Sequence, residues 1–205
     1  MTDKIQFKDV YTDFIKKLRV QTATYHTELE EAGLSSKLMD TELTIETYKK
    51  ILIAFYGFII PAEKHYYTNL QHTFPRLANY KRGGLLEQDL LFLGLSKNDI
   101  NNLPQFMGSP FIKTSDIIGC LYVLEGSKLG GQMISKHVKH KLKFIDEEGS
   151  KFFSAHGAET GYYWKEFIDI LSRFAVDTIQ EEAIIDGAQQ TFENFGKWLK
   201  STNLS

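Results

Sequence analysis

Residues 115–142 read SDIIGCLYVLEGSKLGGQMISKHVKHKL, and we predict that they form one long helix. Four glycines lie inside this segment: Gly119, Gly126, Gly130 and Gly131. Each interior glycine costs a helix roughly 1 kcal/mol relative to alanine. The sum, roughly 3–4 kcal/mol, is a large share of the net stability of an ordinary domain. Some other interaction must therefore compensate for these glycines.

Three of the four glycines fall on one side of the predicted helix. Steps of seven and four residues place Gly119, Gly126 and Gly130 within about 40° of one another, over roughly 16 Å of helix axis. This strip of bare backbone allows a flat ligand to approach closely, and it equally allows a neighbouring helix to pack closely. The spacing alone leaves both interpretations open. The glycines also allow the helix to kink.

The rest of the chain has helical periodicity as well. An apolar stripe from Phe7 to Leu29 predicts a long first helix that ends at Gly33. Further helices are predicted over 45–70, capped by Thr44 and interrupted at Pro61, and over 85–93, 162–174 and 178–199, with a loop at 101–114 and a turn at 146–150. No run of alternating β-branched residues between turns is found. We therefore predict an all-α fold with one domain over residues 1–205.

The composition excludes several classes of protein. Hydrophobic residues make up 42% of the 205 residues, which excludes disorder for most of the chain. With 24 basic and 26 acidic side chains, there is no global electrostatic attraction to nucleic acid or to an anionic membrane. A single cysteine, Cys120, excludes an internal disulfide and a cysteine-based zinc site. Neither a signal peptide nor a membrane span is expected, so we predict a soluble, cytoplasmic protein with no nucleic-acid or membrane partner.

One of the six histidines differs from the others. His26 lies close to the apolar line of the first predicted helix, on the side of Thr22. Glu30, one turn later, is placed to orient the imidazole, and Arg19, about 10 Å earlier along the helix, is placed to meet an anionic group. A single histidine cannot form a closed metal site, but a macrocycle can supply the remaining ligands. The alternative is a buried histidine that is only hydrogen-bonded within the core.

Two motifs, about ninety residues apart, resemble a known family. Residues 18–30, LRVQTATYHTELE, resemble the proximal helix of heme oxygenases, and residues 121–132, LYVLEGSKLGGQ, resemble their distal helix. Residues 89–94, 160–164 and 187–199 also resemble this family. The wording is most similar to the bacterial branch that supplies biliverdin to bacteriophytochromes.

The resemblance implies that heme b lies between a proximal helix and a kinked, glycine-rich distal helix. His26 would then bind the iron, with Glu30 steadying it, while Arg19 and Lys165 would contact the propionates. The residues that the resemblance places around the heme are Arg19, Thr22, Glu30, Gly126, Gly130, Gly131, Lys165, Phe192 and Phe195. It assigns the catalytic positions to Gly126, Ser127 and Gly130.

The implied activity is the oxidative cleavage of heme to biliverdin, ferrous iron and carbon monoxide. Heme would be both cofactor and substrate, and the reaction would use O2 and electrons from a ferredoxin or a flavoprotein reductase. A biliverdin-accepting phytochrome is a further implied partner. The basic helix end at residues 136–143 either docks an acidic electron donor or is simply a solvated surface.

Ser127 departs from the pattern of many heme oxygenases, which have an aspartate at this position. A hydroxyl can relay a proton but cannot hold a negative charge near neutral pH. Two alternatives to the enzyme therefore stay open. One is a heme-binding carrier or sensor without turnover, and the other is a helical interaction module in which the glycines only pack helices.

Overall fold

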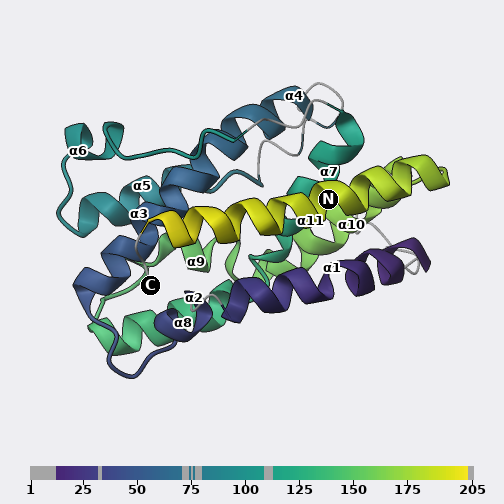
Figure 1. Cartoon of the computed structure of the whole chain (residues 1–205). Coiled ribbons are helices and arrows are strands. Elements are labelled where there is room, and N and C mark those ends of the chain that lie inside the picture. Colours follow the sequence, from purple (N-terminus) through teal and green to yellow (C-terminus); the bar gives the residue numbers. More distant parts are fainter. Residues whose placement is uncertain are drawn as a thin grey trace.

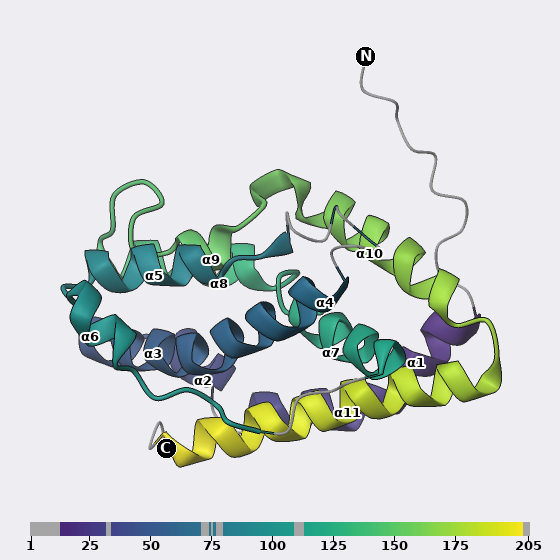
Figure 2. The ribbon, with the colours of Figure 1, turned by 90° about the horizontal axis from the view of Figure 1, so that it is seen from above.

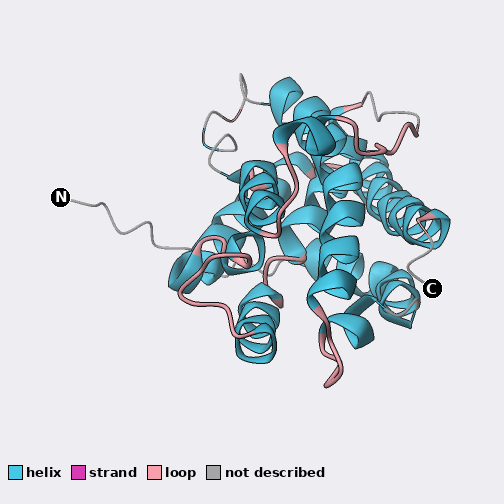
Figure 3. Cartoon of the chain, turned by 90° about the vertical axis from the view of Figure 1, so that its left-hand side faces the viewer, coloured by secondary structure: helices cyan, strands magenta, loops and turns pink. Residues whose placement is uncertain are grey.

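The computed structural model describes residues 13–31, 34–70, 74, 76, 80–108 and 113–202. These residues form helices joined by turns and loops, and no strand occurs among them (Figure 3). The helical elements are α1 (Asp13–Glu31), α2 (Leu34–Leu38), α3 (Ile45–Ala62), the π-helical turn η1 (Glu63–Tyr67), α4 (Thr68–Leu70), α5 (Gly83–Phe92), α6 (Lys97–Asn101), α7 (Thr114–Gly126), α8 (Gly131–Leu142), α9 (Lys151–Ser154), the 3-10 turn η3 (Gly157–Glu159), α10 (Thr160–Phe174) and α11 (Thr178–Ser201). The all-α prediction is confirmed.

Helix α1 follows the predicted apolar stripe. Phe14, Leu18 and Thr22 are buried along it, while Phe7 lies outside the described residues. The stripe faces α11, and the two helices lie side by side over most of their length (Figure 1). An ion pair of 3.0 Å between Lys17 and Glu181 joins their ends.

Helix α3 begins and ends for local reasons. The Thr44 hydroxyl accepts a hydrogen bond of 3.1 Å from the Thr47 amide, which confirms the predicted N-cap. Pro61 lies in the last turn, where its missing N–H disturbs the helical hydrogen-bond ladder. The chain then continues as the π-helical turn η1, a form that is often found at functional sites. The prediction of an interruption at Pro61 is therefore confirmed.

The predicted helix over 115–142 is two helices in the structure. Helix α7 ends at Gly126 and α8 begins at Gly131. The residues between them are held by tight bonds to the third residue back, from Leu129 N to the Gly126 carbonyl at 3.1 Å and from Gly131 N to the Lys128 carbonyl at 3.0 Å. The prediction of one unbroken helix is thus wrong, because the glycines weaken the helical ladder where other contacts hold the turn open. The predicted kink is this four-residue break, residues 127–130.

Helix α7 lies beside α11 (Figure 2), and the two backbones approach more closely than ordinary side chains allow. A Cβ on Gly119 would clash with the Ile184 carbonyl, and a Cβ on Gly187 would clash with the Asp116 carbonyl. Both glycines therefore permit a close backbone approach. The helix-packing interpretation is correct for Gly119.

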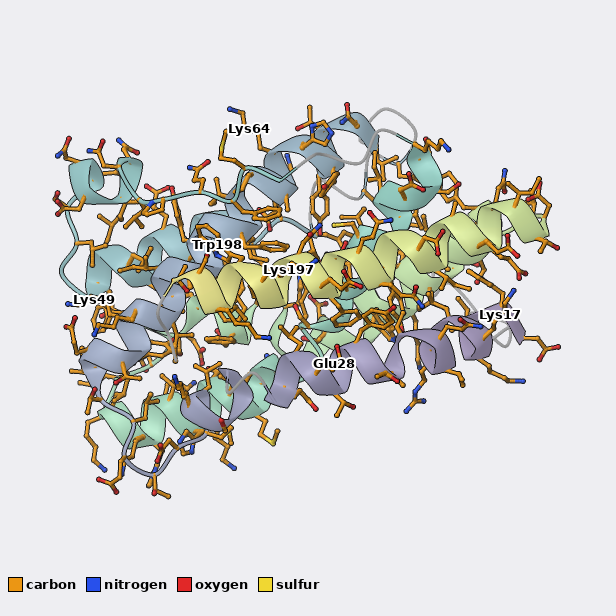
Figure 4. The ribbon with its side chains drawn as sticks, in the orientation of Figure 1. Lys17, Glu28, Lys49, Lys64, Lys197 and Trp198 are labelled. Carbon is orange, nitrogen blue, oxygen red and sulfur yellow. The ribbon has the colours of Figure 1, made fainter. Side chains whose placement is uncertain are left out.

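Further along α11, Trp198 holds the end of the helix against α3. Its indole N–H donates a hydrogen bond of 2.8 Å to the Ala54 carbonyl (Figure 4).

None of the helices in the described ranges is both long and apolar enough to cross a membrane.

Candidate functional site

A cavity of about 630 Å³ lies between α1 on one side and the end of α7, the break and the start of α8 on the other. Its volume falls within the range of ordinary ligand pockets. Aromatic and aliphatic side chains from α3, α9, α10 and α11 close the remaining walls. Among the residues that line it are Arg19, Thr22, His26, Glu30, Arg82, Gly126, Ser127, Gly130, Trp164, Phe192 and Phe195.

The α1 wall presents His26 and Glu30. The His26 side chain is 59% exposed, because it faces the open cavity and not the packed core. Its Nδ1 lies 3.6 Å from a carboxylate oxygen of Glu30, one turn later. The His26 ring also meets the edge of Phe192, with ring centroids 5.8 Å apart. The core-histidine alternative is therefore not supported, and Glu30 is close enough to orient the imidazole.

Arg19 and Thr22 line the same wall in different ways. Arg19 lines the cavity and is exposed, so its guanidinium can reach an anionic group of a ligand there. Thr22 is buried, and its hydroxyl donates a hydrogen bond of 2.8 Å to the Leu18 carbonyl. Because that proton is used within α1, Thr22 contributes shape to the cavity but no donor.

Two glycines of the opposite wall, Gly126 and Gly130, have room for a side chain. A Cβ on Gly130 would have no heavy atom within 4 Å, and on Gly126 it would meet only the Trp164 ring at 3.6 Å. Gly130 has φ −82°, so its backbone does not require a glycine either. Neither packing nor conformation within the protein explains why these two positions are bare. Their place on the cavity wall favours the other interpretation, a flat ligand that lies close to the backbone.

Gly131 and Lys165 do not line the cavity. Gly131 is buried, and its missing Cβ leaves room for the Phe153 carbonyl. Lys165 is exposed on α10, one residue after Trp164, which does line the cavity. The predicted contacts of Gly131 and Lys165 with heme therefore gain no support from their positions.

Phe192 and Phe195 belong to the cavity wall and to the core at once. Both are buried. Phe195 stacks on Phe58 with ring centroids 4.6 Å apart and meets the edge of Phe55 at 5.3 Å. Their rigid placement gives the cavity an apolar wall.

Arg82 is a cavity residue that the sequence did not single out. It precedes α5, is only 3% exposed, and lies over the Phe152 ring with its guanidinium carbon 4.1 Å from the centroid. Its guanidinium donates to the Ser127 hydroxyl and, at 3.3 Å, to the Leu124 carbonyl. Burial lowers the pKa of Arg82, and the nearby carboxylates of Glu125 and Glu63 oppose this effect. Arg82 lies outside the periodic helical patterns, so no spacing indicated it.

The hydroxyl of Ser127 is held in one orientation. It donates to the Leu124 carbonyl at 2.8 Å and accepts from Arg82. Ser127 is itself exposed at the cavity wall. A fixed hydroxyl of this kind can accept one further hydrogen bond, from water or from a ligand.

The comparisons with known proteins agree with this geometry. A family model described as heme oxygenase matches residues 12–201. The chain belongs to the heme oxygenase family. This family member is 25% identical over 188 residues to the heme oxygenase PigA of Pseudomonas aeruginosa, with 91% of each chain covered.

Solved structures of the family have the same fold as this family member. The heme oxygenase of Neisseria meningitidis, solved with bound NO and CO, is 26% identical with a TM-score of 0.76, and the match covers 92% of this chain and 91% of that one. Heme oxygenase-1 of the cyanobacterium Synechocystis, solved in complex with heme, is 17% identical with a TM-score of 0.73, over 94% and 93%. The second likeness is evidence of fold alone. The bacterial relatives are consistent with the predicted bacterial branch.

Proposed function

We propose that this chain is a heme oxygenase that cleaves heme to biliverdin, ferrous iron and carbon monoxide, with O2 and electrons from an external donor. One observation carries the proposal. Gly126 and Gly130 are bare without a packing or conformational reason, and they share an apolar cavity with His26 on the other wall. A flat macrocycle whose iron would be held by the His26 imidazole accounts for all three residues.

Bound heme supplies both the iron at which O2 is activated and the ring that is opened. His26 would hold the iron through the nitrogen remote from Glu30, and the Glu30 carboxylate would fix the orientation of the ring. Arg19 would hold a propionate at the cavity edge. A second propionate partner is not assigned, because Lys165 does not line the cavity.

The cavity wall opposite His26, which carries Ser127, would take part in proton transfer. The Ser127 hydroxyl, fixed by Arg82 and Leu124, offers an acceptor to an ordered water and so would hold a proton donor beside the reacting region. The buried cation of Arg82 favours negative charge developing nearby. With heme in the cavity, the apolar side chains around it would limit the access of bulk water, which would strengthen both effects.

The partners are part of the same proposal. We place the protein in the cytoplasm as one domain over residues 1–205, with a ferredoxin or flavoprotein reductase as donor and a phytochrome as the acceptor of biliverdin. The basic end of α8 supports donor docking only in part. Lys139 already pairs with Glu147 at 2.5 Å, and His137 contacts the Asp40 carbonyl at 3.1 Å.

The test is an absorption spectrum of the protein with one equivalent of hemin, before and after reductant is added in air. We expect a Soret band that decays as a broad red biliverdin band grows, and we expect His26→Ala to lack this conversion. The variant should stay folded, since the His26 side chain is mostly exposed. A Soret band that persists would favour the carrier, and no Soret band would favour the interaction module.

A further inference from the structure

Two buried charges face each other behind the cavity wall that the end of α7 and the break form, on the side away from the cavity. Lys128 Nζ lies 2.7 Å from a carboxylate oxygen of Glu125, and the two side chains are 4% and 2% exposed. Glu125 lies in the last turn of α7, and Lys128 lies in the break between α7 and α8. The ion pair therefore spans the point at which the helix stops.

The ammonium of Lys128 has a partner for each of its three protons. It donates to Glu125, donates to the Tyr80 carbonyl at 2.6 Å, and lies 3.5 Å from His156 Nε2. It also lies 5.2 Å from the centroid of the Tyr80 ring. A lysine has three N–H donors, so this set is complete.

The second carboxylate oxygen of Glu125 is also occupied. It accepts a hydrogen bond from the Tyr67 hydroxyl, which the π-helical turn η1 carries. The Glu125–Lys128 pair thus ties the break to three segments that are distant in sequence: η1, residue 80 and the turn at His156. Burial by these segments lowers the pKa of Lys128, an effect that the negative charge of Glu125 opposes.

Stability does not explain this arrangement. Burying two charges costs several kcal/mol each, and well-packed apolar residues often serve stability as well or better. The best-attested use of a buried polar group is to specify one arrangement among several. Here the alternatives are simple, because a glycine-rich segment can continue as a helix or break at several positions.

We propose that Lys128 is a positioning residue that fixes where the distal helix breaks. By holding Glu125, the Tyr80 carbonyl and His156 together, it sets the backbone of residues 126–130 so that Gly126 and Gly130 line the cavity and Ser127 faces Arg82. Its effect on heme rests on the proposed function, but its effect on the backbone does not.

The test uses the full chain without heme and measures hydrogen exchange of the backbone amides. Removing Lys128 alone deprives the buried Glu125 of its ion-pair partner, which can unfold the protein. The decisive variant is therefore the double change Lys128→Met/Glu125→Gln, which removes both charges and leaves an amide oxygen for Tyr67. The matched control is Lys136→Met, the same change at an exposed position of α8.

In the double variant we expect the amides of residues 127–131 to exchange about tenfold faster or more, while those of α11 keep the parental rates. Lys136→Met should leave both regions unchanged. Parental exchange in residues 127–131 would overturn the proposal. Equal acceleration in α11 would also overturn it, because Lys128 would then contribute only to general stability.

A second measurement connects the position of the break to the reaction. With hemin and reductant, we expect the double variant to form a mixture of biliverdin isomers that differs from that of the parent, since a displaced backbone changes how the ring is seated. An unchanged isomer mixture together with faster local exchange would overturn the role toward heme and leave the break-fixing role standing. If the parent itself fails to convert heme, the proposed function fails, while the exchange measurement still decides the role of Lys128.

Discussion

The guanidinium of Arg82 donates a hydrogen bond to the hydroxyl of Ser127 at the wall of the cavity. This contact joins a buried cation to the position at which many heme oxygenases have an aspartate. In this chain the oxygen at that position belongs to the neutral hydroxyl of Ser127, and the nearby charge is the positive charge of Arg82. Proton handling at this wall therefore depends on two residues.

We predict that Arg82→Lys lowers the rate of carbon monoxide release from heme by roughly 10²-fold, the lower end of what positioned proton-transfer groups contribute. The variant keeps the positive charge beside Glu63 and Glu125, but its shorter side chain loses the guanidinium Nη2, which donates to both Ser127 and Leu124. Carbon monoxide release under reductant measures the rate. Ser127→Ala in the same background should add little, since the partner is already lost. Independent, multiplying effects of the two changes would contradict the coupling.

The two groups of glycines should respond to alanine in opposite ways. Gly126→Ala and Gly130→Ala should keep the free energy of unfolding or raise it by up to about 1 kcal/mol, because neither new methyl group clashes. Both should weaken hemin binding, because the methyl group narrows the cavity. Gly119→Ala should lower the free energy of unfolding by about 1–3 kcal/mol or more, because the methyl group meets the α11 backbone.

Urea unfolding and hemin titration separate these outcomes. The combination of parental stability and weaker binding is the signature of a glycine kept for a ligand. If Gly126→Ala and Gly130→Ala bound hemin with parental affinity, the assignment of this wall to a flat ligand would be lost.

The carboxylate beside His26 should tune heme affinity without affecting the fold. We predict that Glu30→Gln raises the Kd for hemin about tenfold, the usual size of an effect from a group that orients a metal ligand. Its free energy of unfolding should stay within about 0.5 kcal/mol of the parent, because the side chain is exposed. Fluorescence quenching by hemin measures the affinity.

Glu28→Gln is the matched control for this change. Glu28 is exposed on the same helix but does not line the cavity (Figure 4). The Glu28→Gln change removes the same charge from α1 as Glu30→Gln does, so it corrects for long-range attraction or repulsion of the heme propionates. Equal losses of affinity in the two variants would remove the specific role of Glu30.

Local patterns in the sequence predicted much of the fold and the α1 wall. The stripe of α1, the cap at Thr44 and the four-residue spacing of His26 and Glu30 depend on neighbours along the chain, and the structure has each of them. The spacing of Gly119, Gly126 and Gly130 leaves two interpretations open: helix packing is correct for Gly119, and close approach of a flat ligand stays a prediction for Gly126 and Gly130. Whether another helix packs against a given glycine decides between the two interpretations, and the spacing does not reveal this.

The features that the sequence did not predict depend on contacts between distant segments. The break after Gly126 is held by partners more than 40 residues before it and almost 30 after it, Tyr80 and His156. Arg82 comes from the segment before α5, which has no helical period of its own. The contact of Lys165 with heme rests on resemblance and stays a prediction, whereas the neighbouring Trp164 lines the cavity in the structure. Such placements become visible only when the helices are packed.

Acid should loosen the cluster behind the break, through His156. Burial and the positive charges of Lys128 and Arg82 lower the pKa of His156 to about 4, and the ring also lies against Tyr163 in a tilted arrangement with centroids 4.1 Å apart. The unfolded chain has an ordinary histidine pKa near 6.5 and binds more protons than the folded chain between these two values. The free energy of unfolding should therefore fall as the pH drops from about 6.5 toward 4.

His156→Gln should show a shallower fall in the free energy of unfolding between pH 7 and pH 5, because glutamine still accepts from Lys128 but does not titrate. Urea unfolding at each pH measures this. His140→Gln, at an exposed position of α8, should keep the parental slope. Since each variant is compared with itself across pH, any strain that the change introduces at the left-handed backbone of His156, φ 66°, cancels. Parental slopes in both variants would mean that protonation of His156 does not weaken the cluster.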